Sequence, residues 1–282
     1  MSVRAFDDGV DRWKMVQAAP APSLRGLVDS YSDYWEQTTS FSARRELAAT
    51  TGVLIYVFGE PLEVIGADGE AIMVRAGEGF AGGIADATSV TRAMGAQAGV
   101  HAFLPLASLA AVTDAPLPEI ANRVVPMRDL IGAAAETLGG PLCDAAGAEQ
   151  RFTLLDAFLA DRFARHDVMN GPINWAMGQL SRAAGPATSR LAGEIGWSRR
   201  HFISRFRAAT GFSPDHFRRI ARFERFTAAI IGSPNEGLAG LAADCGYFDQ
   251  AHLTRDVRAF SDMTPGELRA RLLPSEAGVR DD

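Results

Sequence analysis

The chain has 282 residues, of which 47% are hydrophobic and 22% are charged, so it is long enough for about two domains and can bury a core. No run of about 18 apolar residues is present, and the first residues lack an apolar segment, so we expect neither a membrane span nor a signal peptide. The two cysteines, Cys143 and Cys245, lie far apart, which favours a reduced protein of the cytoplasm.

The charge is unevenly distributed. The net charge is −6, yet residues 171–273 contain 14 Arg and 9 Asp or Glu and therefore carry +5. The remaining residues then carry −11. Because local charge matters more for partner choice than the overall balance does, this segregation is compatible with a nucleic-acid partner for the C-terminal part, although +5 over about a hundred residues is equally compatible with a solvated surface.

The N-terminal part is predicted to be rich in β-strands. Short segments rich in β-branched residues are separated by Gly- and Pro-containing turns, at 52–59, 62–66, 71–77, 89–95 and 100–106. Five or more such strands predict a small barrel or sandwich over residues 1–110.

The pattern then becomes helical. We expect helices at 125–138 and 149–166, the second with an apolar stripe formed by Phe152, Leu155, Leu159 and Phe163. Predicted breaks stand at Gly139-Gly140-Pro141, Gly171-Pro172 and Gly185-Pro186. The chain is thus predicted to be α+β, with a helical connector at 111–170, an all-α domain at 171–273 and a flexible tail at 274–282. Homodimerisation through the helix at 149–166 is one hypothesis.

Two segments near the C-terminus repeat one pattern. GWSRRHFISRFR (196–207) and GYFDQAHLTRDV (246–257) align when Ser198 is matched with Asp249. Each follows a helix and a turn glycine, and each leads to a Ser-Pro or Thr-Pro pair that starts a further helix. Ser198 and Asp249 are residue types that cap helix N-termini. The repeat predicts two helix-turn-helix motifs in one domain.

The residues shared by the two copies face inward. A helical wheel places these side chains inside: Phe202, Phe206, Ala209, Leu253, Val257 and Phe260. It places the following side chains outside: Arg200, Ile203, Ser204, Arg207, Ala251, Thr254, Arg255 and Arg258. Two different outer faces can read two different stretches of DNA. Residues 214–231 between them predict one helix of about 27 Å, which approaches the ~34 Å between major-groove faces on one side of a duplex.

Residues 187–273 closely resemble the DNA-binding domain of the AraC/XylS family of bacterial transcription regulators. GYFDQAHLTRDVRAFSDMTP (246–265) is similar to that family's second helix-turn-helix signature. The resemblance implies that both recognition helices enter successive major grooves of double-stranded DNA and activate or repress transcription, with RNA polymerase as a further partner. Ser204 departs from the Arg that first copies usually carry, and Arg205 follows it.

Wheel position and resemblance together assign roles. Base contacts are expected from Arg200, Ile203, Ser204, Gln250, Thr254 and Arg255. Phosphate contacts are expected from Arg207, Arg218, Arg258 and Arg269. Any single arginine among these could equally be a solvated surface charge.

The N-terminal part carries a looser resemblance. RAGEGFAGG (75–83) and GVHAFLPLASL (99–109) are similar to the cupin-like domain of a subset of such regulators, which implies effector sensing or dimerisation. Candidate residues of an effector pocket are Tyr56, Phe58, Phe80 and Phe103, which core packing explains equally well. Arg44, Arg45 and Arg92 are candidates for binding an anionic effector.

Catalysis is not expected. Metal-dependent cupins need several His ligands, and only His101 lies before residue 166, so we predict no metal, cofactor or catalytic residue. The G-x-G-x-x-G match at 77–82 is not followed by an amphipathic helix and is interpreted as a turn. A sequence-specific regulator is therefore favoured. The alternatives are an enzyme or binding module of cupin type localised to DNA by its tail, and a non-specific architectural DNA binder.

Overall fold

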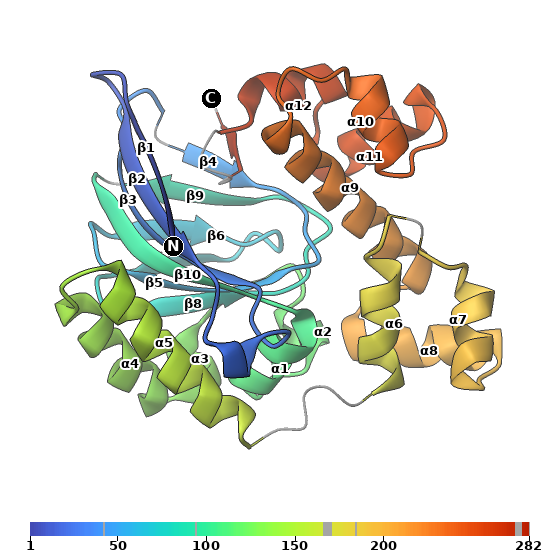
Figure 1. Ribbon diagram of the computed structural model, residues 1–282, viewed down its shortest axis with the longest axis horizontal. Helices are drawn as coiled ribbons and strands as arrows, with labels where there is room; N and C mark the ends of the chain where they lie inside the picture. Colours follow the sequence, from blue (N-terminus) through green and yellow to red (C-terminus); the bar gives the residue numbers. More distant parts are fainter. Residues whose placement is uncertain (42, 94, 166–170, 184, 274–277, 282) are drawn as a thin grey trace.

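The computed structural model describes residues 1–41, 43–93, 95–165, 171–183, 185–273 and 278–281. A β-rich N-terminal part lies beside a helical C-terminal part (Figure 1). The predicted α+β fold is confirmed. None of the described helices is both long enough and apolar enough to cross a lipid bilayer.

The N-terminal part contains two antiparallel sheets that are not closed into a barrel, so the sandwich alternative is the one observed. The first sheet has, in spatial order, strands β1 (Ser2–Asp7), β2 (Arg12–Ala18), β3 (Ser30–Gln37), β10 (Gln97–Leu104), β5 (Gly52–Val57), β8 (Gly79–Gly82) and β11 (Val124–Pro126). The second has β12 (Val279–Arg280), β4 (Ala43–Glu46), β9 (Ser89–Ala93), β6 (Leu62–Ile65) and β7 (Ala71–Val74).

The first four strands were not expected from the sequence. β1 and β2 form a hairpin whose turn contains Gly9 at φ 85°. The side chain of Asp8 accepts hydrogen bonds from the backbone N–H groups of Val10 and Asp11 in this turn. The Asp-Gly pair between two alternating segments is the signal that could have revealed the hairpin.

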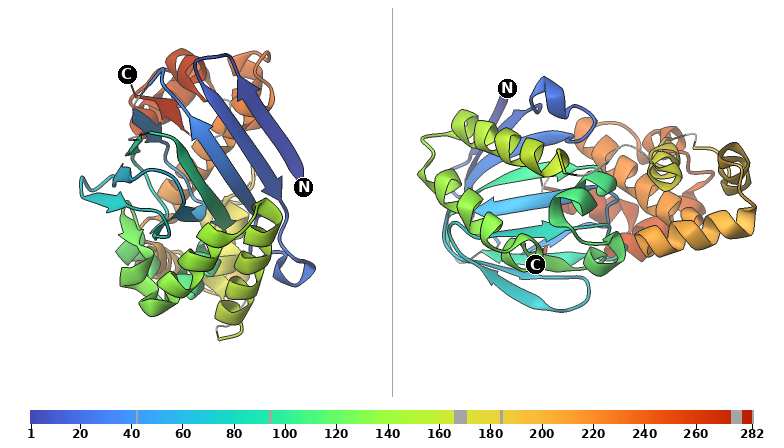
Figure 2. Two further views of the ribbon diagram at one scale, coloured as in Figure 1. Left: turned by 90° about the vertical axis from the view of Figure 1, so that its left-hand side faces the viewer. Right: turned by 90° about the horizontal axis from the view of Figure 1, so that it is seen from below.

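Helices cover the outer face of the first sheet (Figures 1 and 2). They are η1 (Pro22–Leu24), α1 (Leu106–Thr113), α2 (Leu117–Ile120), α3 (Met127–Ile131), α4 (Ala133–Asp144) and α5 (Ala148–Phe163). α1 contacts β5 and β10, α3 contacts β8, and α5 contacts β3. The helices predicted as a connector therefore pack on the β-rich part, which favours one N-terminal unit reaching to about residue 163.

The apolar stripe of α5 is buried in its own domain. Phe152, Leu155, Leu159 and Phe163 all belong to the core, and the Phe152 ring stacks on Tyr31 of β3 at 5.5 Å. A dimer formed through this helix would have to use its other face. His166, the last residue of the predicted helix, lies outside the described residues.

Two predictions around the preceding helices were wrong. The helix expected at 125–138 is divided into β11, α3 and α4, because Gly132 at φ 57° ends α3. The break expected at Gly139-Gly140-Pro141 lies inside α4. Gly139 has a packing role, since a Cβ there would collide with the carbonyl oxygen of Gly77. Residues 139–141 were predicted as a break because the sequence does not show that the Gly77 backbone packs against Gly139 within the helix.

The C-terminal part is all helical. Its helices are α6 (Pro172–Leu180), α7 (Thr188–Ile195), α8 (Arg199–Thr210), α9 (Pro214–Gly232), α10 (Leu238–Asp244), α11 (Gln250–Ser261) and α12 (Pro265–Arg271). α9 runs between two groups of helices, with α6–α8 at one end and α10–α12 at the other (Figure 1). Five phenylalanines fully buried along α8 and α9 form its core: Phe202, Phe206, Phe217, Phe223 and Phe226.

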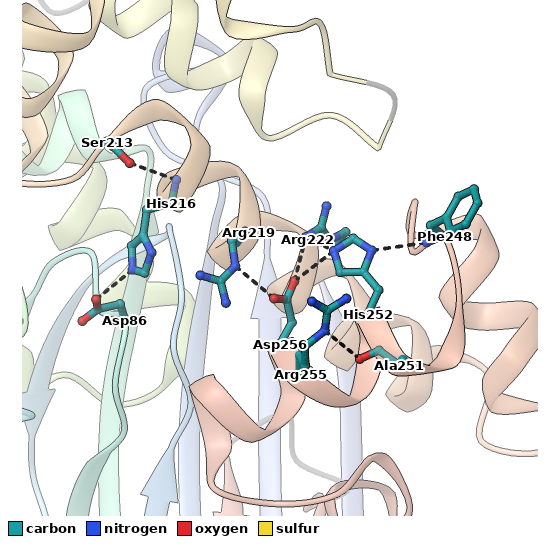
Figure 3. Close-up of polar contacts among 10 residues, drawn as sticks. All are labelled: Asp86, Ser213, His216, Arg219, Arg222, Phe248, Ala251, His252, Arg255 and Asp256. Atoms are coloured by element: carbon teal, nitrogen blue, oxygen red, sulfur yellow. Dashed lines mark hydrogen bonds and ion pairs between the residues drawn. The ribbon is translucent and has the colours of Figure 1, made fainter.

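α9 also contacts the N-terminal part. The carboxylate of Glu224 accepts hydrogen bonds from the Thr50 backbone N–H at 2.9 Å and from the Thr51 hydroxyl at 2.6 Å. Near the start of α9, His216 Nε2 lies 2.8 Å from Asp86 Oδ2 (Figure 3). α9 therefore contacts the N-terminal part as well as both helix groups of the C-terminal part.

The tail predicted to be flexible at 274–282 is ordered where it is described. Val279 is fully buried and pairs with Arg45 of β4, and Asp281 forms an ion pair with the Arg45 guanidinium. The prediction was wrong for residues 278–281, because this segment pairs with the edge strand β4, which is distant in the sequence. Residues 274–277 and 282 lie outside the described residues.

Candidate DNA-binding surface and effector cavity

The first helix-turn-helix is built from α7 and α8. Gly196 follows α7 at φ 81°, a left-handed conformation that glycine adopts without strain. The Ser198 side chain accepts a hydrogen bond from the His201 backbone N–H at 3.2 Å and thereby caps α8. The inner position predicted for Ala209 was wrong: Ala209 is exposed, and the next residue, Thr210, is the buried one.

The second helix-turn-helix repeats this design with α10 and α11. Gly246 adopts φ 86°, and the Asp249 side chain accepts a hydrogen bond from the His252 backbone N–H at 2.7 Å. The inner residues Leu253, Val257 and Phe260 are buried as predicted. α12 begins with a reciprocal cap between Thr264 and Glu267, which lowers the pKa of the Glu267 carboxyl through hydrogen bonds from Thr264.

The residues expected to contact bases face solvent. Ile203 and Thr254 are partly buried, and the other four are exposed: Arg200, Ser204, Gln250 and Arg255. The Thr254 hydroxyl donates to the Gln250 carbonyl oxygen at 2.8 Å, and Arg255 Nε donates to the Ala251 carbonyl at 3.3 Å (Figure 3). Their roles in reading DNA remain predictions.

The arginines expected to contact phosphates fall into two groups. Arg207 and Arg258 are exposed near the C-terminal ends of the two recognition helices. Arg218 forms an ion pair with Asp215, and Arg269 donates to the Glu236 carbonyl at 2.7 Å. The second group must leave or share these partners to bind phosphate.

A buried carboxylate fixes α11 on α9 (Figure 3). Asp256 has a side chain only 3% exposed; its oxygens lie 3.0 Å from Arg219 Nε and 2.7 Å from an Arg222 terminal nitrogen. The same Arg222 nitrogen lies 2.8 Å from His252 Nε2. Burial, aided by Arg222, lowers the pKa of His252. Sequence reasoning missed this network, although an Asp on the inner face of a helix beside Leu253 and Val257 was its signal.

Phe248 lies beside the start of α11 and is 92% exposed. Its backbone N–H donates to His252 Nδ1 at 3.4 Å, and its ring points away from the helices (Figure 3). Nothing in the sequence distinguished it from a core phenylalanine.

A cavity of about 410 Å³ lies between the two sheets of the N-terminal part. Phe80 and Phe103 line it, as expected. Tyr56 and Phe58 do not, because they share the opposite parity and face the helices. The Tyr56 hydroxyl donates to the Ala135 carbonyl at 3.3 Å, and the Arg151 guanidinium lies 4.6 Å from the Phe58 ring centroid.

The three arginines predicted to bind an anionic effector lie in different places relative to the cavity. Arg44 lines the cavity and lies 2.7 Å from the Glu36 carboxylate. Arg45 turns to Asp281 at the outer face, and Arg92 pairs with Glu63 at 3.0 Å, also outside the cavity. Only one of the three can reach a ligand between the sheets.

His101 faces the cavity among rings. Its ring centroid lies 4.8 Å from that of Tyr34 and 5.6 Å from that of Phe103. Burial, with a smaller contribution from the Arg44 charge, lowers its pKa from 6.5 to about 4, so the imidazole is neutral at pH 7. Among the described residues, no three His, Cys, Asp or Glu side chains are grouped to hold a metal ion.

The mouth of the cavity is bordered by α9. Glu224, Thr227 and Ile231 of this helix all line the cavity, together with Leu272. The helix that joins the two helix-turn-helix motifs is therefore also a wall of the cavity.

Comparison with known proteins agrees with this architecture. Residues 191–271 match a family model described as "Helix-turn-helix domain". Among solved structures, unsaturated fatty acid bound ToxT from Vibrio cholerae strain SCE256 is 7% identical, covers 94% of this chain and 96% of its own, and has a TM-score of 0.50. A further ToxT structure from Vibrio cholerae, in the P21 form, is 7% identical with coverages of 93% and 98% and a TM-score of 0.50. No curated protein sequence matches the chain.

The likeness to ToxT shows a shared fold of the whole chain and nothing further at this identity. The C-terminal part is a helix-turn-helix domain, a class of fold that binds double-stranded DNA. With two helix-turn-helix copies joined by α9, it is similar to the AraC/XylS DNA-binding domain, and the resemblance expected from the sequence is confirmed for this region.

Proposed function

We propose that this protein is a sequence-specific regulator of transcription that places α8 and α11 in two successive major grooves of double-stranded DNA. The observation that supports this most strongly is the pair of capped helices, each with a buried apolar face and an exposed polar face, at the two ends of α9. α9 has 19 residues and therefore a length of about 28 Å, which suits grooves about one helical turn apart.

In this proposal the exposed faces of α8 and α11 contain residues that contact bases and residues that contact phosphates. Arg200 and Arg255 donate two hydrogen bonds to guanine O6 and N7, and Gln250 pairs with adenine, each contact contributing about 1–3 kcal/mol of discrimination. Ile203, Ser204 and Thr254 complete the base contacts. Arg207 and Arg258 bind phosphates, which set the register without reading sequence.

The N-terminal cavity is the proposed effector site. α9 borders its mouth and is held there by Glu224, so a ligand between the sheets can change how α9 presents the two recognition helices. The structure of ToxT with a bound unsaturated fatty acid shows that a protein of this fold binds a small molecule, which supports a small-molecule effector for this chain. The proposal also includes two protein partners in the cytoplasm, a second copy of this chain and RNA polymerase.

The test is a selection of bound fragments from random DNA by the full-length protein, followed by affinity measurements for Arg200→Ala and Arg255→Ala. Each variant is expected to weaken binding to the selected site more than binding to random DNA, because a base contact is lost. Arg128→Ala, an exposed arginine of α3, is the matched control and should change neither affinity. Equal losses on both DNAs would favour a non-specific architectural binder and contradict the proposal.

A further inference from the structure

The turn of the second helix-turn-helix is one residue longer than the turn of the first. A single residue, Trp197, stands between Gly196 and Ser198, whereas two residues stand between Gly246 and Asp249. Both of these two residues are aromatic, so the sequence alone does not say which of them is the additional one.

The structure identifies Phe248 as the additional residue. The backbone N–H groups of Trp197 and Tyr247 each donate to the carbonyl oxygen of the residue five positions earlier, at 2.8 and 2.9 Å. Each of these two rings also lies edge-on to the histidine of the helix that follows, with centroid distances of 4.9 Å to His201 and 5.3 Å to His252, respectively. Trp197 and Tyr247 are therefore equivalent, and Phe248 has no counterpart in the first motif.

Phe248 projects from the surface between two residues that are held in place. It is 92% exposed, whereas Phe6, the next most exposed phenylalanine, is 42% exposed. Tyr247 before it is buried against Phe226, and Asp249 after it caps α11. The fold therefore fixes the backbone on both sides of Phe248 but buries almost none of its ring, which points away from the helices (Figure 3). Aromatic rings are enriched where a partner buries them.

The ring lies at the end of α11 that is proposed to face bases. In a helix-turn-helix, the N-terminal residues of the recognition helix contact base edges. Phe248 directly precedes Asp249, whose carboxylate already accepts a hydrogen bond from the helix that it caps. The exposed side chains of Gln250, Arg255 and Arg258 along α11 carry hydrogen-bond donors for bases and phosphates. DNA that receives Gln250 therefore also meets Phe248.

A phenyl ring has no polar atom, which limits what it can contact on a base edge. The base edges in the major groove present hydrogen-bond donors and acceptors, and their apolar group is the C5-methyl of thymine. We propose that Phe248 is a specificity-determining residue whose ring packs on the C5-methyl of a thymine in the groove that α11 enters. This inference rests on the proposed function, in which α11 lies in a major groove. Because the first motif has no equivalent residue, the contact is made in only one of the two half-sites.

The experiment removes the methyl group and the ring separately. In the DNA site selected by the full-length protein, each thymine is replaced in turn by 2′-deoxyuridine, which lacks only the C5-methyl. The Kd for each DNA is measured with the wild-type protein and with Phe248→Ala. The matched control is Phe6→Ala, which removes an exposed phenylalanine from β1 of the N-terminal part. The half-site read by α11 is the one whose base preference is relaxed by Arg255→Ala.

The wild-type Kd should rise about fourfold when one thymine of that half-site loses its methyl group, the change expected for one apolar carbon that is no longer removed from water. Phe248→Ala should raise the Kd for the unmodified site by at least as much. This variant should also be insensitive to deoxyuridine at that thymine, because the methyl group then has no ring against it. Phe6→Ala should change neither Kd. The melting temperature of Phe248→Ala should equal that of the wild-type protein, because the exposed ring contributes little to the fold.

Three results would overturn the proposal: an unchanged DNA affinity of Phe248→Ala, an effect of deoxyuridine that persists in this variant, or a lowered melting temperature, which would assign the ring to the fold. An unchanged DNA affinity combined with weaker transcription by purified RNA polymerase would assign the ring to a protein partner instead. In each of these cases the wild-type protein still selects a DNA site, so the proposed regulator stands. A wild-type protein that selects no site would remove the proposed function itself, and this contact with it.

Discussion

Protonation of His101 should limit the stability of the protein in mild acid. Burial lowers the pKa of this imidazole in the folded chain from 6.5 to about 4, whereas the unfolded chain keeps the ordinary value. Between these two values the unfolded state binds more protons, so the free energy of unfolding falls as the pH falls from about 6.5 toward 4. One pKa unit corresponds to about 1.4 kcal/mol, so the loss is about 2 kcal/mol at pH 5 and about 3 kcal/mol at pH 4.

The assay is urea unfolding followed by tryptophan fluorescence at pH 4, 5, 6 and 7.5, for the wild-type protein and for His101→Gln. Tyr34 and Arg44 interact with this imidazole, and Lys14, Glu36, Glu46, Arg123 and Glu224 line the same cavity. The titration of these groups is common to both proteins, so the difference between the proteins reports mainly on His101. The wild-type protein should lose stability relative to the variant by the stated amounts. A difference that stays constant from pH 7.5 to pH 4 would refute a buried, neutral His101.

Further predictions concern packing and the buried network. Gly139→Ala should lower the melting temperature, because its Cβ would collide with the Gly77 carbonyl, whereas Gly140→Ala meets no atom within 4 Å and should add about 0.5–1 kcal/mol of helix stability; equal effects in thermal unfolding would contradict this packing. Asp256→Asn leaves the half-buried Arg222 without its carboxylate and should destabilise the protein by about 3 kcal/mol, the low end for a broken buried pair. Denaturant unfolding that shows no change would mean that this contact is absent in solution.

The helix-turn-helix motifs could be predicted because their signals are local. A turn glycine, a capping side chain and an apolar stripe lie within twelve residues of one another, and Ser198, Asp249, Gly196 and Gly246 all take the expected positions. Five of the strands from residue 52 onward could be recognised for the same reason, whereas the segment 77–82, interpreted as a turn, contains β8, and β11 lies at the start of a predicted helix.

Features that depend on distant partners could not be predicted. Tyr56 and Phe58 were placed in the pocket because strand parity gives two faces without saying which one the helices cover. The tail at 278–281 depends on the edge of β4, more than 200 residues earlier in the chain. The inner-face position of Asp256 indicates burial, but its partners Arg219 and Arg222 become evident only when α9 lies against α11.

The central claim is that one chain reads two successive major grooves. The most direct measurement is the affinity for the selected DNA site after insertion of about 5 base pairs, half a helical turn, between its two half-sites. The account predicts a loss of nearly all specific affinity, because α9 cannot present α8 and α11 to opposite sides of the duplex. Insertion of a full turn should not restore the affinity either. Affinity that does not depend on the spacing would show that only one helix-turn-helix reads sequence and would contradict the account.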